Sequence, residues 1–291
     1  MQKITPYLWF DNQAEEAVNF YTSCFQHGTI NNTSRYPDEP MAGPTAGMEG
    51  KVLTVAFDLA GLSFVALNGG PHYKFTPAIS FFVNCESKEE LNSLWEKLID
   101  GGTALMPLQT YPFSELYGWL HDKYGVCWQL NLSEGPQNIV PFLMFVGGQN
   151  GHAEEAMKLY ISLFENSSVD FVAPNEAGNV QQAAFRLDGQ DFMTIDGGTD
   201  HNFTFTEAIS FYVNCDSQAE VDHYWHALSA VPESEQCGWL KDKFGVSWQI
   251  IPDTLIKLMG DPDPEKSRRV MEAMLQMKKI DIAGLDAAYD G

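Results

Sequence analysis

The amino-acid sequence contains an internal repeat, which constrains the fold more than any other feature. TPAISFFVNC at 76–85 returns as TEAISFYVNC at 206–215, and GWLHDKYGVCWQL at 118–130 returns as GWLKDKFGVSWQI at 238–250. The stretches ITPYLWF and AEEAVNFY return as IVPFLMF and AEEAMKLY. Such self-similarity indicates one folding unit that is used twice. We therefore predict two domains, residues 1–135 and 136–252, followed by a tail at 253–291 with a helix that starts at Asp263.

The charge balance excludes several classes of partner. The 291 residues include 17 Lys and Arg against 39 Asp and Glu, a formal net charge of -22. Nucleic acid and anionic lipid surfaces would repel such a chain. No run of about 18 apolar residues predicts a membrane span, and the first residues do not resemble a secretory signal. We expect a cytoplasmic protein. Its five Cys, an odd number without a C-x-x-C pair, argue against a disulfide framework.

Hydrophobic periodicity predicts a strand, a helix and then further strands, twice within each copy. In copy one the predicted helices are 14–25 and 88–100, and the predicted strands are 5–10, 51–58, 62–68, 78–84, 103–110, 119–122 and 126–132. Residues 26–50, which contain many Gly and Pro, are predicted as a loop. The apolar strand faces formed by Ile79, Phe81 and Val83, and by Val126, Trp128 and Leu130, are expected to pack under the helices.

These motifs resemble the PhnB-like branch of the glyoxalase/bleomycin-resistance superfamily, also called vicinal oxygen chelate proteins. The resemblance rests on ITPYLWFDNQAEEAVNFY, ALNGG, PAISFFVNC and YGWLHDKYGVCWQLN, and the tail resembles relatives labelled 3-demethylubiquinone 3-methyltransferase. The resemblance to this superfamily implies an α+β fold of paired βαβββ modules whose mixed sheets curl into cups, with two modules per copy. Single-copy relatives commonly dimerise, so the resemblance implies a pseudo-dimer within one chain, and a homodimer of chains is a further expectation.

In the metal-using enzymes of this superfamily, His or Glu side chains on the first and last strands of each module bind a divalent ion. By register, the corresponding residues are Pro6, Ala78 and Gln129 in copy one and Pro141, Ala208 and Gln249 in copy two. A shift of one residue would place Thr5 or Tyr7 at the first position. None of these is a usual metal ligand, so we expect neither a metal nor another cofactor.

Strand alternation predicts the side chains that line the cup. The expected ligand-binding residues are Ser80, Phe82, Asn84 and Gln129, with Ser210, Tyr212, Asn214 and Gln249 in copy two. The long aromatic segment 106–119 has only a short equivalent near 229–236 in copy two. Because such segments often cover sites, we favour the cup of copy one and add Gln109, Tyr111, Phe113 and Trp119 as rim residues. Packing between the copies would explain the same segment, and a closed cup would need no ligand.

The resemblance and the cup residues favour binding of a small organic molecule without metal. A few polar groups among aromatic rings suit a neutral or polarised ligand. Whether the protein is an enzyme stays open, and no catalytic residue is identified. The alternatives are a metal-dependent lyase, isomerase or dioxygenase of the same superfamily, a methyltransferase as in the family label, and a structural scaffold. The methyltransferase is disfavoured because the glycine-rich stretch 145–157 lacks G-x-G-x-x-G spacing.

Two further features receive a structural interpretation. Asp122 and Lys123, which recur as Asp242 and Lys243, are expected to form an ion pair in a solvent-exposed turn. Cys127 faces the cup by alternation, but no His neighbours it in sequence, so a nucleophilic role is not favoured.

Overall fold

The structure is a computed structural model that describes residues 2–36, 38 and 47–291. The first copy supplies the following elements: β1 (Ile4–Phe10), α1 (Ala14–Cys24), β2 (Thr29–Arg35), β3 (Val52–Leu59), β4 (Leu62–Asn68), β5 (Ile79–Cys85), α2 (Lys88–Ile99), β6 (Thr103–Tyr111), β7 (Ser114–His121) and β8 (Cys127–Leu132). The predicted helices and most predicted strands are therefore confirmed to within a few residues.

The second copy repeats this series with changes near its end. Its elements are β9 (Asn138–Val146), the 3-10 turn η2 (Gly147–Gln149), α3 (Ala153–Leu163), β10 (Ser168–Pro174), β11 (Val180–Leu187), β12 (Gln190–Gly198), β13 (Ile209–Cys215), α4 (Gln218–Leu228), the 3-10 turn η3 (Pro232–Ser234), β14 (Trp239–Lys241) and β15 (Ser247–Pro252). The tail adds α5 (Asp253–Met259), α6 (Pro264–Leu275) and α7 (Ile282–Asp290). As predicted, the Asp263 side chain caps α6 by accepting a hydrogen bond from the N–H of Glu265.

Two predicted elements need correction. The loop predicted at 26–50 contains β2, a strand with the polar sequence TINNTSR that lies exposed at a sheet edge. Residues 37 and 39–46 of that loop lie outside the described residues. The aromatic segment 106–119 belongs to a β6–β7 hairpin rather than to a covering loop.

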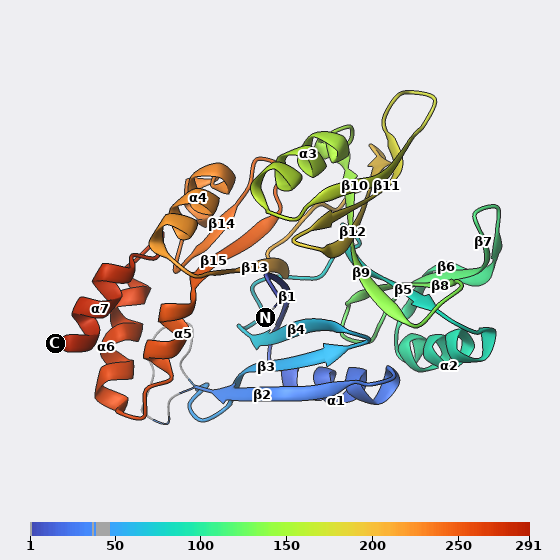
Figure 1. Ribbon diagram of the computed structural model, residues 1–291. Coiled ribbons are helices and arrows are strands. Elements are labelled where there is room, and N and C mark those ends of the chain that lie inside the picture. Colours follow the sequence, from blue (N-terminus) through green and yellow to red (C-terminus); the bar gives the residue numbers. More distant parts are fainter. Residues whose placement is uncertain (1, 37, 39–46) are drawn as a thin grey trace.

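The strands form two curled mixed sheets, and each sheet combines modules from both copies (Figure 1). The seven-stranded sheet has the order β14-β15-β13-β1-β4-β3-β2, and the eight-stranded sheet has the order β10-β11-β12-β9-β5-β8-β7-β6. Antiparallel pairing of β1 with β13 places Tyr7 opposite Ser210, and pairing of β5 with β9 places Ser80 opposite Phe142. The sequence-based assignment of one cup to each copy is therefore corrected: each concave face is shared between the copies.

Strand register also corrects the face of two prolines. Pro6 pairs with Phe211, and Pro141 pairs with Phe81. Because Phe81 and Phe211 belong to the large hydrophobic core, both prolines lie on the helix-facing side of their sheets. The neighbouring residues Tyr7 and Phe142 therefore point to the concave faces, since successive side chains alternate.

The main core lies between the sheets and helices α1 to α4, and it joins the two sheets. The Phe64 and Phe81 rings, from β4 and β5, are 5.0 Å apart between centroids. The expected apolar strand faces are buried here, with Phe81, Val83, Trp128 and Leu130 fully excluded from solvent. Among the described residues no helix is long and apolar enough to cross a bilayer.

Asp122 and Asp242 are buried in this core, so the predicted solvent-exposed ion pairs are wrong. The Asp122 carboxylate accepts hydrogen bonds from the Tyr21 hydroxyl and the Trp128 indole, each at 2.8 Å, and from two backbone N–H groups of its own turn. Burial raises the pKa of this carboxyl, and the four donors partly oppose that shift. The Asp242 carboxylate repeats the arrangement in copy two.

The tail forms a second, smaller core against the seven-stranded sheet (Figure 1, orange and red). Ile280 and Leu285 are fully buried and pack in one cluster with Ile251 of β15 and Tyr212 of β13. The tail also pairs through its backbone, because the N–H groups of Cys237 and Gly238 donate to the carbonyls of Met277 and Lys278 at 2.8 and 2.7 Å. The tail is thus attached to the segment that leads into the edge strand β14.

Candidate functional site

The concave face of the eight-stranded sheet is closed by its own side chains. The amide of Gln129 donates to the Ser80 hydroxyl at 2.8 Å, and its oxygen accepts from the Tyr117 hydroxyl at 2.6 Å. All three residues are buried. Phe142, Met144 and Val146 of β9 fill the remaining space together with Phe82 and Trp119. These contacts leave the predicted polar residues bound to one another.

Three of the other predicted residues of this sheet, Asn84, Tyr111 and Phe113, also have partners within it. The Asn84 amide donates to Asn138 at 2.8 Å and accepts from Asn131 at 3.0 Å. Tyr111 stacks on Phe113, with 5.5 Å between centroids, and meets Tyr117 edge-on. Gln109 is exposed on β6. The buried indole N–H of Trp119 has no partner among the described residues.

The concave face of the seven-stranded sheet carries two rows of side chains across the strands. Tyr7, Ser210, Ser247 and Lys241 are cross-strand neighbours in one row. Thr5, Tyr212, Gln249 and Trp239 form the next row. The Gln249 amide donates to Ser210 at 2.9 Å, as Gln129 does to Ser80. Tyr7 stacks on Tyr212 with 5.4 Å between centroids, and burial raises the pKa of Tyr7 to about 12.

This second face lacks the group that closes the first one. The repeat places Cys237 where copy one has Tyr117. In the described part of the chain, the Gln249 side-chain oxygen therefore has no hydroxyl donor to match Tyr117. Copy two has also lost the strand that corresponds to β6, and the short turn η3 takes its place. The edge of this sheet is consequently open.

A cavity of about 280 Å³ lies at this open edge. Its lining combines three aromatic rings with polar groups from the η3 segment and the strands: Trp9, Tyr73, Trp239, Glu207, Glu233, Ser234, Gln236, Cys237, Leu240 and Ser247. Trp9 comes from copy one and Trp239 from copy two. The cavity therefore exists only because the copies share this sheet.

The aromatic walls are held by specific contacts. The Trp9 indole donates to the carbonyl of Gly70 at 2.8 Å. The ring of Trp9 is nearly perpendicular to those of Tyr73 and Trp239, with interplanar angles of 80° and centroid distances of 4.9 and 5.9 Å. A Cβ on Gly69 would come within 2.2 Å of the Trp9 ring. The first glycine of the ALNGG motif thus permits the close approach of Trp9.

The polar groups of the cavity are of two kinds. Glu207 pairs with Lys241 at 2.7 Å, both being largely shielded from solvent, whereas Glu233 is exposed. Burial, together with the Glu207 carboxylate, raises the pKa of Tyr73. The Ser247 hydroxyl is different, because the residue is only 1% exposed and its oxygen has no hydrogen-bond partner among the described residues.

Sequence reasoning found this face but missed the cavity. Ser210, Tyr212 and Gln249 lie on the same concave face, and Gln249 is the cross-strand partner of Trp239. The lining residues Tyr73 and Glu207 lie in two different loops. These loops are held together by a hydrogen bond from the Thr206 hydroxyl to the carbonyl of Lys74 at 2.8 Å. Two signals were available: the repeat aligns Trp119 with Trp239, and the deletion in copy two marks the open edge.

The glycine-rich stretch and Cys127 are engaged in the fold. The Asp196 carboxylate accepts hydrogen bonds from the N–H groups of Gly151 and Ala153, at 2.7 and 3.2 Å, and so occupies the start of α3. The Sγ atom of Cys127 lies 3.1 Å from Nδ1 of His121, a neighbour in the fold that stands six residues away in the sequence. Burial raises the pKa of this thiol well above its usual value, and Asp122 adds to the effect.

Among the described residues no three His, Cys, Asp or Glu are grouped to hold a metal ion.

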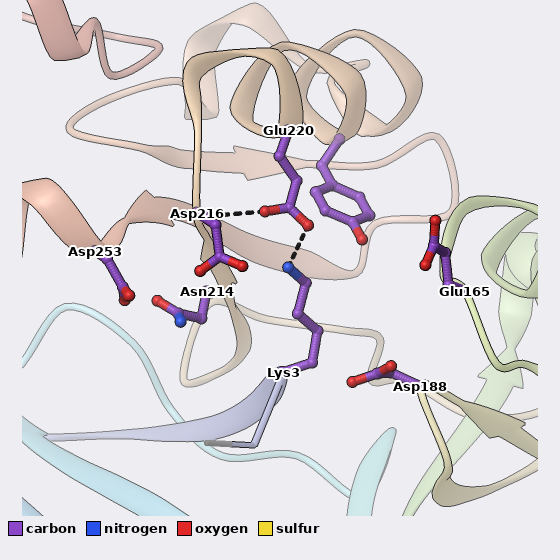
Figure 2. Close-up of a pocket in the computed structure, with 8 residues that line it drawn as sticks. Lys3, Glu165, Asp188, Asn214, Asp216, Glu220 and Asp253 are labelled. Atoms are coloured by element: carbon purple, nitrogen blue, oxygen red, sulfur yellow. Dashed lines mark hydrogen bonds and ion pairs between the residues drawn. The ribbon is translucent and has the colours of Figure 1, made fainter.

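A larger and strongly acidic pocket of about 430 Å³ lies at the other end of β13. Figure 2 shows the Glu220 carboxylate paired with Lys3 and accepting a hydrogen bond from the N–H of Asp216. Four more acidic or amide side chains surround this pair: Glu165, Asp188, Asn214 and Asp253. The single ammonium group is thus already neutralised, and this pocket has no aromatic wall apart from Tyr224.

Comparison with known proteins identifies a family. The family described as 3-demethylubiquinone-9 3-methyltransferase matches residues 2–131 and again 137–251. A solved structure from Bacillus cereus, described as a putative 3-demethylubiquinone-9 3-methyltransferase, PhnB protein, is 47% identical. The match covers 45% of this chain and 100% of that one, with a TM-score of 0.42. No curated protein matches the chain.

Two longer structures share the fold at low identity. Glyoxalase I from Zea mays is 10% identical over 84% of this chain and 89% of its own, with a TM-score of 0.53. A putative dioxygenase from Bacillus subtilis is 9% identical over 97% of this chain and 94% of its own, with a TM-score of 0.51. The predicted glyoxalase fold of paired modules in two tandem copies is confirmed.

Proposed function

The chain belongs to the 3-demethylubiquinone-9 3-methyltransferase family, the PhnB-like branch of the glyoxalase superfamily, and from this premise we propose that it binds a small organic molecule in the cavity beside Trp9. The proposed ligand enters at the open edge of the seven-stranded sheet. It contacts the aromatic walls and hydrogen-bonds to Ser247. Small-molecule sites are commonly such concave, ring-lined spaces with a few well-placed polar groups.

The observation that carries this proposal is the Ser247 hydroxyl. It is buried, lines the cavity and has no partner among the described residues. A buried hydroxyl without a hydrogen bond costs about 1–3 kcal/mol. A ligand with a donor or acceptor at this point removes that cost, which favours binding over an empty cavity.

The contrast between the two concave faces supports the same conclusion. Where Tyr117 bonds to Gln129, the face is filled by its own side chains. Where Cys237 replaces that tyrosine, a cavity is present. We therefore assign the binding function to the seven-stranded sheet, and we interpret Ser80 and Gln129 as its closed, structural counterparts.

Binding accounts for these residues better than the alternatives. A metal-dependent lyase, isomerase or dioxygenase needs several His or carboxylate ligands on the concave face, where Tyr7, Ser210 and Gln249 stand. Methyl transfer, which the family description names, needs a place for a methyl donor. The glycine-rich turn before α3 does not offer one, because Asp196 already accepts from its N–H groups.

A fragment screen with matched variants at one position tests the proposal. Ligand-observed NMR would be run on the full chain with a library of small aromatic and polar compounds. Ser247→Leu places a larger apolar side chain in the cavity, whereas Ser247→Ala keeps the space and removes only the hydroxyl. We expect fragments that bind the natural chain, lose binding in the Leu variant and keep weaker binding in the Ala variant.

Thermal unfolding of both variants shows whether they are folded. If folded Ser247→Leu binds every fragment as the natural chain does, ligands are held elsewhere and the proposal is wrong. The absence of any bound fragment would equally contradict it.

A further inference from the structure

Resting on this proposed function, we infer that the ligand is a small organic cation, of the methylated ammonium class, held by an aromatic cage. The inference names the charge of the ligand, which the binding proposal leaves open. It follows from the arrangement of the rings and from the charges at the mouth of the cavity.

The rings form the walls of a cage. Trp9, Tyr73 and Trp239 all line the same cavity, and the Trp9 ring stands at 80° to each of the other two rings. The face of an aromatic ring carries partial negative charge and attracts a cation within about 6 Å of its centroid. Tryptophan is the strongest of these attractors, and two of the three rings are tryptophans. A methylated ammonium presents both the charge and an apolar surface to such walls.

The charged groups near the cage are predominantly acidic. Two carboxylates, Glu207 and Glu233, line the cavity, and the Lys241 ammonium neutralises the first of them. Glu233 is exposed, and the salt bridges among the described residues near this segment, Glu207 with Lys241 and Glu235 with Lys278, do not include it. Glu235 of the same segment is occupied, because it pairs with Lys278 at 3.1 Å and accepts from Ser229. The excess charge at the mouth is therefore negative, and the whole chain carries a net charge of -22.

These charges change the expectation from sequence. A neutral or polarised ligand was expected because the predicted lining contained Ser, Asn, Gln and aromatic residues. The actual lining adds two carboxylates from loops, Glu207 before β13 and Glu233 in η3. An anionic ligand would be repelled here, and a neutral one would gain nothing from them. A cation gains from both the rings and the carboxylates.

A pair of probes with the same shape isolates the effect of charge. Choline and 3,3-dimethylbutan-1-ol differ in that a quaternary nitrogen is replaced by carbon. Isothermal titration of the full chain with each probe is the measurement. We expect choline to bind at least about tenfold more tightly than the alcohol. Added salt should lower the affinity for choline and leave the affinity for the alcohol unchanged.

Three variants test whether the difference in affinity between choline and the alcohol arises at this cavity. Glu233→Gln removes an exposed charge and is expected to fold. It should lower the affinity for choline severalfold and leave the affinity for the alcohol unchanged. Glu176→Gln, in the exposed turn between β10 and β11, is the matched control and should change neither. Trp239→Leu should abolish the preference for choline.

The outcomes separate this inference from the binding proposal. If both probes bind equally, or if the alcohol binds more tightly, the inference is overturned while the cavity remains a binding site. If choline does not bind and neutral fragments still bind in a manner that Ser247→Leu abolishes, the cation inference alone fails. If neither fragments nor choline bind, both proposals fail.

Discussion

At the scale of single residues, Gly69 decides whether Trp9 can form a wall of the cavity. A Cβ at this position would lie 2.2 Å from the ring, and the ring cannot retreat because its indole bonds to Gly70 and the ring packs edge-to-face with Tyr73 and Trp239. We predict that Gly69→Ala destabilises the protein by about 1–3 kcal/mol, as overpacking does, and weakens ligand binding. Urea unfolding measures the first effect and titration the second.

Gly148→Ala is the control for this prediction. Gly148 has open space around a built Cβ and an ordinary backbone conformation. It should therefore accept alanine without loss of stability. Equal effects of the two substitutions would show that the proximity of Trp9 is not the cause.

The buried carboxylates of Asp122 and Asp242 allow the same test in both copies. Each accepts four hydrogen bonds, from a Tyr, a Trp and two backbone N–H groups. Alanine at either position leaves these donors buried without an acceptor, so we predict a loss of about 3–5 kcal/mol in each case. Chemical denaturation of the two variants is the measurement.

Asp286→Ala, at an exposed position of α7, serves as the matched control and should change stability by less than about 0.5 kcal/mol. A loss at Asp122 as small as this would mean that the carboxylate does not hold the turn. A large loss at only one of the two buried positions would show that the copies no longer share this network.

At the scale of elements, the tail stabilises the segment that forms the mouth of the cavity. Ile280 is fully buried in the tail core, and the adjacent Met277 and Lys278 carbonyls accept from the N–H groups of Cys237 and Gly238. We predict that Ile280→Ala costs about 2–4 kcal/mol and speeds hydrogen exchange at Cys237 and Gly238. Hydrogen exchange followed by mass spectrometry measures the exchange rates of the backbone amides in both the tail and this segment.

Leu275→Ala provides the comparison within the tail, because Leu275 ends α6 and is 48% exposed. It should leave exchange near β14 unchanged. If Ile280→Ala also leaves it unchanged, the tail does not hold the mouth of the cavity.

The elements also show which parts of the fold can be predicted from sequence. Helix α1 and strand β4 follow from regular apolar spacing, because one face of each is buried in the core. Strand β2 has no such signal, since TINNTSR pairs at an exposed edge and buries almost nothing. The face of Pro6 was misassigned because a shift of one residue exchanges the two faces of a strand, and local sequence alone does not fix that register.

The site is harder to predict because its residues come together through pairing between the copies. Trp9 and Trp239 are 230 residues apart in the chain, and only the pairing of β1 with β13 brings their strands into one sheet. Tyr73 lies in a loop and Glu233 in the three-residue turn η3, and neither segment has a hydrophobic periodicity. Sequence reasoning that treats each copy as a separate cup therefore finds Gln249 and Ser210 but not the aromatic cage.

At the scale of the whole molecule, the shared sheets predict what happens when the chain is divided at the proposed boundary between residues 135 and 136. Each half then carries two modules but lacks the partner strands of β1 and β5, or of β9 and β13. Unpaired strand edges favour association with another chain. We predict that the two halves, refolded together, form a 1:1 complex that contains the cavity, and that each half alone forms a homodimer or aggregates.

Native mass spectrometry of the separate and mixed halves distinguishes these outcomes, with the undivided chain at equal concentration as the control. Because Tyr7 faces Ser210 in one sheet and Phe142 faces Ser80 in the other, the mixed complex restores both junctions. Its choline and fragment binding should match that of the undivided chain, whereas a homodimer of residues 1–135 lacks Trp239 and Ser247 and should not bind. Two stable, independent monomers would contradict the exchange of modules, because each copy would then complete its own sheet.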